Sequence, residues 1–284
     1  MKNATVLVVV GKSAKPADLE QLSEAARERN LHLSVLILGL MPTIPVYSYG
    51  YGGLGGYAIP EGWDAKVHET NTQLAASRDQ LSQFLANQAA SADVRVISGE
   101  VAAMPEAVTS SALTCDIVLL GNDLRNDGFL FADTLHATLF RSPAAVIING
   151  LTDPRVLQPK SVFVAWKAGV PASRAVHAAL PLLREADTVT IGLFDPTTSE
   201  TQDGENPGSD IAAWLTHQGC NVTVVPYPSG GAEIGIAMRK RATEIGADLI
   251  VMGAYGHSRL REVVFGGTTE SMVEQRDCAV LFCH

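Results

Sequence analysis

Short apolar runs rich in β-branched residues alternate along the whole chain with segments of helical periodicity, and this alternation constrains the fold more than any other feature. The runs span 5–10, 32–39, 93–97, 116–121, 144–148, 161–166, 188–194, 221–227, 248–253 and 278–283. Apolar runs of this kind are typical of buried parallel strands, which are connected by right-handed crossovers. We therefore predict an α/β fold built on doubly wound, mostly parallel sheets.

The segments between the runs carry amphipathic patterns. The first begins at Asp18, a candidate cap, and places Leu19, Leu22 and Ala26 on one face. A longer helix is predicted over 64–90, and further helices are predicted over 105–114, 172–185, 208–218 and 233–246.

Two stretches of the first half recur in the second. Residues 112–121 (ALTCDIVLLG) align with 244–253 (EIGADLIVMG), and 141–149 align with 276–284. We interpret this as an internal duplication that gives two similar domains, 1–150 and 160–284, joined by a linker over 150–159. Between the aligned stretches lie 19 residues in the first half (122–140) and 22 in the second (254–275).

The charge and the hydrophobicity of the chain limit the kinds of partner that we expect and the cellular compartment. The net charge of −9 leaves no basic surplus for nucleic acid or an anionic membrane. No stretch is long enough to span a bilayer, and the apolar run within residues 1–10 is too short for a secretory signal. We therefore expect a cytoplasmic protein. Its four cysteines fit reduced core positions, and Cys278, Cys283 and His284 lack the spacing of a metal site, so we predict no metal.

A glycine-rich loop follows the apolar run 248–253. Residues 253–269 read GAYGHSRLREVVFGGTT, and a helix-compatible stretch comes next. The glycines are Gly253, Gly256, Gly266 and Gly267, and Thr268 and Thr269 follow them. Glycines at the carboxyl end of a strand allow tight turns, and a helix N-terminus offers unpaired N–H groups to phosphate.

The pattern G-x-x-G, nine residues, then G and a small or hydroxyl residue resembles the nucleotide loop of the universal stress protein family. The resemblance implies two tandem flavodoxin-like domains, similar also to the adenine-nucleotide alpha hydrolases. It further implies that the second domain binds ATP or another adenine nucleotide, with or without Mg²⁺, through the glycines, Thr268 and Thr269. His257 and Arg259 are candidate phosphate contacts within the loop. Lys167 stands where the family often has an acidic residue, and we include it as a candidate contact.

The corresponding loop of the first half, 121–140, lacks the later glycine pair. It carries Asp123, Asp127 and Asp133, whose carboxylates would repel phosphate, so we predict a degenerate site.

Two other glycine patterns do not predict a nucleotide site. Gly11-Lys12-Ser13 resembles the end of a P-loop, but Val6 occupies the required upstream glycine position. Residues 50–55 match G-x-G-x-x-G, yet they lie in the Gly-, Tyr- and Pro-rich segment 41–63 and do not open a helix. That segment fits either a partner-covered loop or a plain connection.

These observations favour a universal stress-type protein that acts by binding and signalling. No histidine lies in a nucleophile–base motif, so no catalytic residue is predicted. Two alternatives remain: a nucleotide-free interaction protein, favoured by Lys167 and by the missing hydroxyl at Gly267, and a slow ATPase. The family resemblance also implies pairing of terminal strands, here 144–148 with 279–283, as an intramolecular pseudo-dimer. A homodimer of the whole chain is compatible with this pairing.

Overall fold

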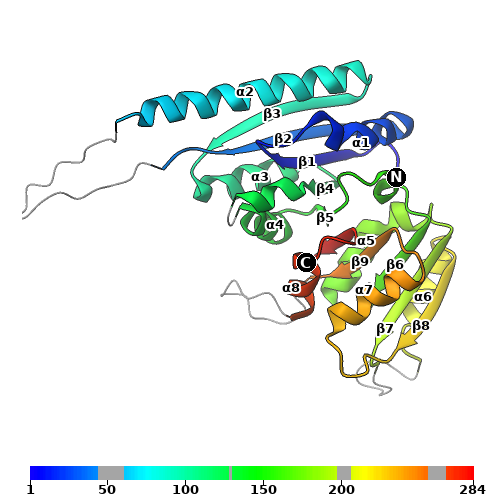
Figure 1. The fold of residues 1–284 in the computed structure, drawn as a ribbon. Coiled ribbons are helices and arrows are strands. Elements are labelled where there is room, and N and C mark those ends of the chain that lie inside the picture. Colours follow the sequence, from blue (N-terminus) through cyan, green and yellow to red (C-terminus); the bar gives the residue numbers. More distant parts are fainter. Residues whose placement is uncertain (44–60, 128–129, 197–205, 255–266) are drawn as a thin grey trace, which may run out of the picture.

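The computed structural model describes residues 1–43, 61–127, 130–196, 206–254 and 267–284, and the structural statements below concern these residues (Figure 1). One sheet contains the strands of both halves. The first half supplies β1 (Thr5–Gly11), β2 (His32–Leu40), β3 (Ser91–Gly99), β4 (Ile117–Leu120) and β5 (Ala145–Ile148). The second half supplies β6 (Ser161–Ala165), β7 (Thr188–Phe194), β8 (Val222–Tyr227), β9 (Leu249–Gly253) and β10 (Val280–Cys283).

The strand order shows the same winding in both halves. The order across the sheet is β3-β2-β1-β4-β5-β10-β9-β6-β7-β8, so each half has its strands in the order 3-2-1-4-5. Neighbours within each half are parallel. The predicted doubly wound α/β class is thereby confirmed. Within this class, the third strand of each half, β3 or β8, lies at the outer edge of the sheet. A flavodoxin sheet would place its third strand between the first and the fourth.

The two halves join through the antiparallel pair of β5 and β10, in which Val146 lies opposite Phe282 and Ile148 opposite Val280. Because this pair is antiparallel, the carboxyl ends of the other strands point in opposite directions in the two halves.

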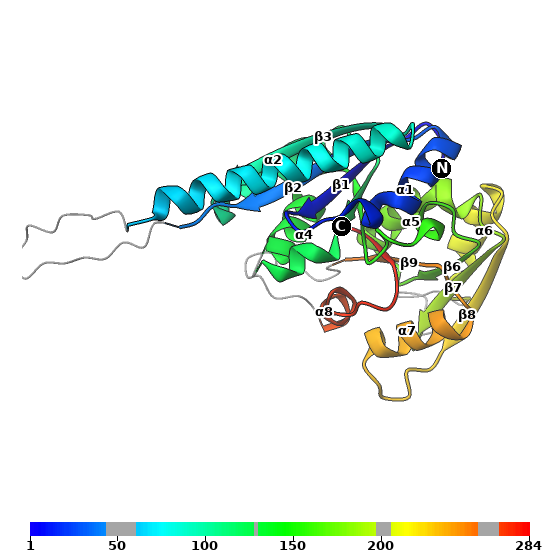
Figure 2. The same cartoon turned by 45° about the horizontal axis from the view of Figure 1, so that its top comes forward.

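Helices cover both faces of the sheet. One apolar cluster contains α1 (Pro16–Arg29), α2 (Trp63–Asn87), α5 (Val170–Leu183) and α6 (Ser209–His217). The other contains α3 (Met104–Ala112), α4 (Leu130–Arg141), α7 (Ile234–Glu244) and α8 (Gly267–Glu274). In Figure 2, α2 runs along β2 and β3 of the first half, and α1 lies on the same side of the sheet. Each cluster includes strand residues of both halves, such as Val8 and Val164 in the first.

Two local predictions need correction. Asp18 is the third residue of α1 rather than its cap, and its carboxylate accepts a hydrogen bond of 2.8 Å from the Lys15 N–H. Residues 122–140, compared above with a ligand loop, contain a 3₁₀ helix, η2 (Asn122–Asn126), and most of α4. α4 forms because Phe131, Leu135 and Leu139, spaced four residues apart, fall on one buried face of a helix.

An aspartate before the fourth strand of each half makes the same contact with the first strand. Asp116 accepts a hydrogen bond of 2.8 Å from Thr5 N, and its own N–H donates to Thr5 O at 2.9 Å. Asp248 accepts from Ser161 N at 3.1 Å and donates to Ser161 O at 2.8 Å. The aligned sequences therefore fold with matching backbone contacts.

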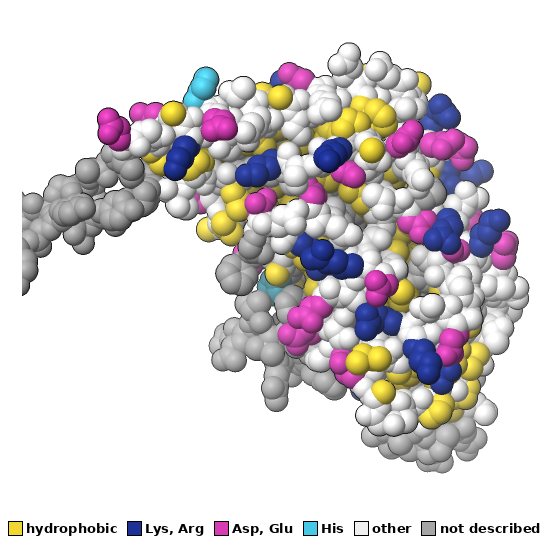
Figure 3. All heavy atoms as spheres, viewed as in Figure 1, with side chains coloured by type: hydrophobic (Ala, Val, Ile, Leu, Met, Phe, Trp, Pro, Cys, Tyr) yellow, Lys and Arg dark blue, Asp and Glu magenta, His cyan; other side chains and the backbone are white. Residues whose placement is uncertain are grey.

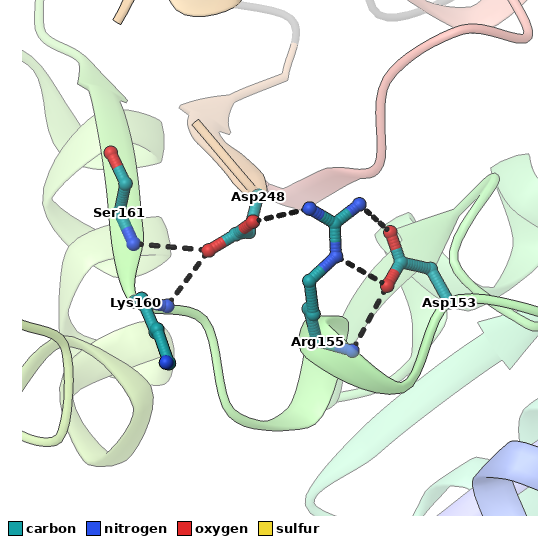
Figure 4. Close-up of polar contacts among 5 residues, drawn as sticks. All are labelled: Asp153, Arg155, Lys160, Ser161 and Asp248. Atoms are coloured by element: carbon teal, nitrogen blue, oxygen red, sulfur yellow. Dashed lines mark hydrogen bonds and ion pairs between the residues drawn. The ribbon is translucent and has the colours of Figure 1, made fainter. Parts of the chain in front are cut away.

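Asp248 also holds the segment between the halves (Figure 4). Its carboxylate accepts from Lys160 N at 2.8 Å and from Arg155 Nη1 at 2.9 Å. Arg155 belongs to the 3₁₀ helix η3 (Pro154–Leu157) and also pairs with Asp153 at 2.7 Å. The connecting segment is thus fixed to the start of β6 and β9.

Asp248→Asn is expected to lower the free energy of unfolding by about 1 kcal/mol, because the amide oxygen keeps part of the backbone contact but loses its charge. Urea denaturation measures the change. Asp116→Asn is the matched control, since no salt bridge to Asp116 is present in the described residues. An equal loss of unfolding free energy for both substitutions would show that the Arg155–Asp248 salt bridge contributes nothing to stability.

A further contact between the halves is the salt bridge from Arg29 Nη1 to Glu185 Oε2, 2.5 Å long, which links α1 to the turn after α5. On the face drawn in Figure 3, acidic and basic side chains are interspersed. Among the described residues, no helix is both long and apolar enough to cross a bilayer.

Candidate functional site

The candidate site lies at the carboxyl edge of β6 and β9, where the winding of the second half reverses. From β6 the sheet continues to β7 and β8, and from β9 it continues to β10 on the other side. The helices that pack beside these strands, α5 and α8, belong to opposite faces. Ligands of open α/β folds bind at such a switch point.

The structure brings part of the predicted site to this edge. Gly253 is the last residue of β9, and Lys167 follows the adjacent, parallel strand β6. Gly267, Thr268 and Thr269 open α8. The remaining candidates, Gly256, His257, Arg259 and Gly266, lie outside the described residues.

Gly253 is required for packing, whether or not a ligand binds. A Cβ at this position would lie 2.4 Å from the Ala172 nitrogen and 2.6 Å from the Pro171 carbonyl carbon. Both atoms belong to the first turn of α5. The missing side chain therefore lets α5 begin directly against the end of β9.

The start of α8 has a different environment. Gly267 is exposed, and a Cβ there would meet no described atom within 4 Å. Met272 and Val273 are buried and hold the helix on the sheet, while Thr269 is buried at 6% exposure. The first N–H groups of a helix have no partner within it and carry the positive end of its dipole, so the start of α8 is suited to an anion.

Lys167 is exposed between β6 and α5. In the described part of the chain it forms no salt bridge. Its ammonium group is therefore available to a phosphate at this edge.

A groove of about 420 Å³ lies between α7 and α8 and borders Gly267. Its lining includes Glu233, Glu270 and Glu274, with Arg239 as the basic residue. Three carboxylates disfavour phosphate, so the groove is a poorer phosphate site than the edge of the sheet.

The equivalent edge of the first half is filled by a side chain of the protein itself. Asp123 Oδ2 accepts hydrogen bonds from Gly11 N at 2.8 Å and from Ser13 Oγ at 3.4 Å. A Cβ on Gly121, directly after β4, would lie 2.6 Å from Asp123 Oδ1. Burial raises the pKa of the Asp123 carboxyl, and the hydrogen bond from Gly11 partly opposes this shift. The Asp123 carboxylate thus fills the space beside Gly11 and Gly121 at the ends of β1 and β4.

The cysteine and histidine residues at the C-terminus pack within the fold. Burial raises the pKa of the Cys278 and Cys283 thiols. The His284 ring lies 4.3 Å from the Phe140 ring, and its Nδ1 lies 3.2 Å from Ala254 O. The described residues contain no group of three or more side chains able to hold a metal ion.

Sequence reasoning missed the residues through which the first half contacts α8. Arg125 Nη2 donates to Val273 O at 2.8 Å, and Asn149 Nδ2 donates to Gln275 O at 2.9 Å. The alignment of 141–149 with 276–284 offered an indirect signal, since pairing these terminal strands brings Asn149 near the end of α8.

The chain is similar to known proteins in sequence over one segment and in structure over its whole length. The sequence model of the universal stress protein family matches residues 230–284. No curated protein matches the chain in sequence. A universal stress protein from Archaeoglobus fulgidus is similar in structure, with a TM-score of 0.67 and 15% identity over 98% of this chain and 97% of that one.

Two proteins from Pseudomonas aeruginosa are also similar over the whole chain. One, assigned to the universal stress proteins, has a TM-score of 0.59 and 13% identity over 99% of this chain and 93% of that one. The other, of unknown function, has a TM-score of 0.56 and 14% identity over 99% of this chain and 92% of that one. At such identities these matches establish the fold of the chain.

Proposed function

We propose that this chain, a relative of the universal stress proteins by the sequence of residues 230–284 and by the fold of its whole length, binds an adenine nucleotide in its second half and acts by binding rather than catalysis. ATP is the proposed ligand, with its phosphates at the start of α8. The glycine loop 253–267 and Thr268 would surround the phosphates, and Lys167 would approach them from the end of β6.

The contrast between the carboxyl edge of β1 and β4 in the first half and that of β6 and β9 in the second carries the proposal. In the first half, the Asp123 carboxylate occupies the edge between β1 and β4. Extending the alignment of 112–121 with 244–253 by two residues places Tyr255 at the corresponding position, and tyrosine has no carboxylate. The second half combines this position with the glycine pattern, an exposed lysine and the exposed start of a helix. These features support an anionic ligand in the second half.

Strand pairing at the centre of the sheet supports the second element of the proposal. β5 and β10 pair antiparallel, so the two halves are arranged head to head within one chain. We propose that this arrangement is a pseudo-dimer of two domains, 1–150 and 160–284, of which only the second is the nucleotide-binding member.

Gly267→Asp tests the site directly. The exchange places a carboxylate at the first residue of α8, where it should weaken adenine-nucleotide affinity at least about tenfold by repelling phosphate. The same charge should leave the fold intact, because an acidic residue near a helix N-terminus stabilises the helix by about 0.3–1 kcal/mol. Titration calorimetry with ATP and mass spectrometry of nucleotide released on denaturation provide the measurements.

Gly267→Ala is the matched control, because it adds only a methyl group at the same exposed position and should change affinity little. Equal affinity of the Asp variant and the wild type would place the phosphates elsewhere. A wild-type protein that is purified empty and does not bind added ATP, ADP, AMP or cyclic AMP would instead support the nucleotide-free interaction protein.

A further inference from the structure

The C-terminal end of α8 is held by the half of the chain that carries the degenerate loop. Arg125, in η2, donates from Nη2 to the carbonyl oxygen of Val273 at 2.8 Å. Val273 is the residue before the last of α8, so its carbonyl is one of those left unpaired by the end of the helix. The same guanidinium nitrogen lies 3.4 Å from Asn149 Oδ1.

Asn149 extends this contact into the turn after α8. Its Nδ2 donates to the carbonyl oxygens of Gln275 at 2.9 Å and Cys278 at 3.2 Å. The Gln275 side chain in turn accepts from the N–H groups of Asp277 at 2.8 Å and Cys278 at 2.9 Å. The end of α8 and the turn into β10 therefore form one hydrogen-bonded unit with the first half.

Arg125 is well fixed in this position. Its guanidinium carbon lies 3.7 Å from the centre of the Phe131 ring, a cation–π contact with α4. Burial, aided by the charge of Arg276, lowers its pKa to about 10, so the side chain remains protonated at neutral pH. A cation at the C-terminal end of a helix complements the helix dipole.

The turn that carries Arg125 is itself anchored. Asp123, two residues earlier, binds the Gly11 N–H at the end of β1, and Leu124 is fully buried between them. The Asp123 carboxylate at the edge of β1 and β4 thus also fixes η2, from which Arg125 reaches the second half.

We propose that Arg125 is a positioning residue for the nucleotide site of the second half. It holds the C-terminal end of α8 so that the N–H groups at the N-terminal end stay oriented toward the phosphates. α8 has eight residues and is about 12 Å long. Without this contact, a tilt of about 10° would displace one end of α8 relative to the other by roughly 2 Å, enough to misalign hydrogen bonds to phosphate. This inference rests on the proposed function.

Arg125→Ala in the full-length protein tests the proposal by two measurements. Hydrogen exchange of the α8 amides, measured without ligand, should become about tenfold faster. ATP affinity should fall about tenfold. Arg125→Lys, which keeps the charge but loses the planar contact with Phe131, should lie between the wild type and the Ala variant in both measurements.

Arg29→Ala is the matched control, because it also removes an arginine contact between the halves, but Arg29 lies on α1, which packs on the face of the sheet opposite α8. This variant should lower the free energy of unfolding of the whole chain. Hydrogen exchange of the α8 amides should speed up no more than that loss of stability accounts for, and ATP affinity should stay the same. Asp123→Ala should act like Arg125→Ala, since it frees η2.

The two measurements separate this inference from the proposed function. Unchanged α8 exchange in Arg125→Ala, or faster exchange with unchanged ATP affinity, would overturn the positioning role. If the wild type binds no adenine nucleotide, the proposed function fails and the positioning role for a nucleotide fails with it. The exchange data would then still show whether Arg125 holds α8.

Discussion

Phe282→Ala is expected to lower the free energy of unfolding by about 3–5 kcal/mol, because it removes a fully buried aromatic ring from the centre of the sheet. Phe282 lies on β10 between Val146 of β5 and Met252 of β9. The apolar cluster around it includes residues of both halves. The loss should therefore destabilise the whole chain in one transition rather than the second half alone.

Urea denaturation followed by circular dichroism and by tryptophan fluorescence measures this effect. Trp63 reports on the first half, and Trp166 and Trp214 report on the second. Phe282→Leu, which keeps most of the apolar volume, is the control and should cost clearly less. Separate transitions, with the first half unfolding at its wild-type midpoint, would contradict the shared core.

Gly253→Ala is expected to cost about 2–3 kcal/mol, because the added Cβ would overlap the backbone of Pro171 and Ala172. Backbone atoms of a helix cannot move aside as the end of a side chain can. The first turn of α5 should therefore shift away from β9. Thermal and chemical denaturation measure the loss of stability.

The same exchange at Gly267 provides a contrast. Gly267 opens α8 with no described atom near a Cβ, so alanine there should leave stability unchanged or raise it by up to about 1 kcal/mol. A stability loss at Gly253 no larger than at Gly267 would show that the contact with α5 relaxes freely. The two glycines of one motif thus have separable roles, one in packing and one at the exposed edge.

The strands and most helices could be predicted from sequence because their signal is local. Buried parallel strands require continuous apolar runs, and the runs at 5–10 and 188–194 closely match β1 and β7. α4 was missed because its residues were compared with a ligand loop. The spacing of Phe131, Leu135 and Leu139 already carried a helical pattern.

The contacts that define the candidate site depend on distant parts of the chain. Asp123 was expected to repel phosphate, whereas in the structure it binds the Gly11 N–H, 112 residues away. Arg125 and Val273 are 148 residues apart, and their contact follows from the pairing of β5 with β10. Local periodicity contains no information on such contacts, so their prediction requires the strand order first.

The antiparallel pair at the centre of the sheet also limits how two copies of this chain could associate. β5 and β10 already occupy each other's edges, so neither is open to a strand from a second molecule. The outer strands are β3 and β8, which carry Arg95 and Pro226. Charged residues and proline on edge strands hinder strand addition. A homodimer, if one forms, would therefore use helices or loops, and the two proposed nucleotide sites would belong to separate chains, each supported by its own first half.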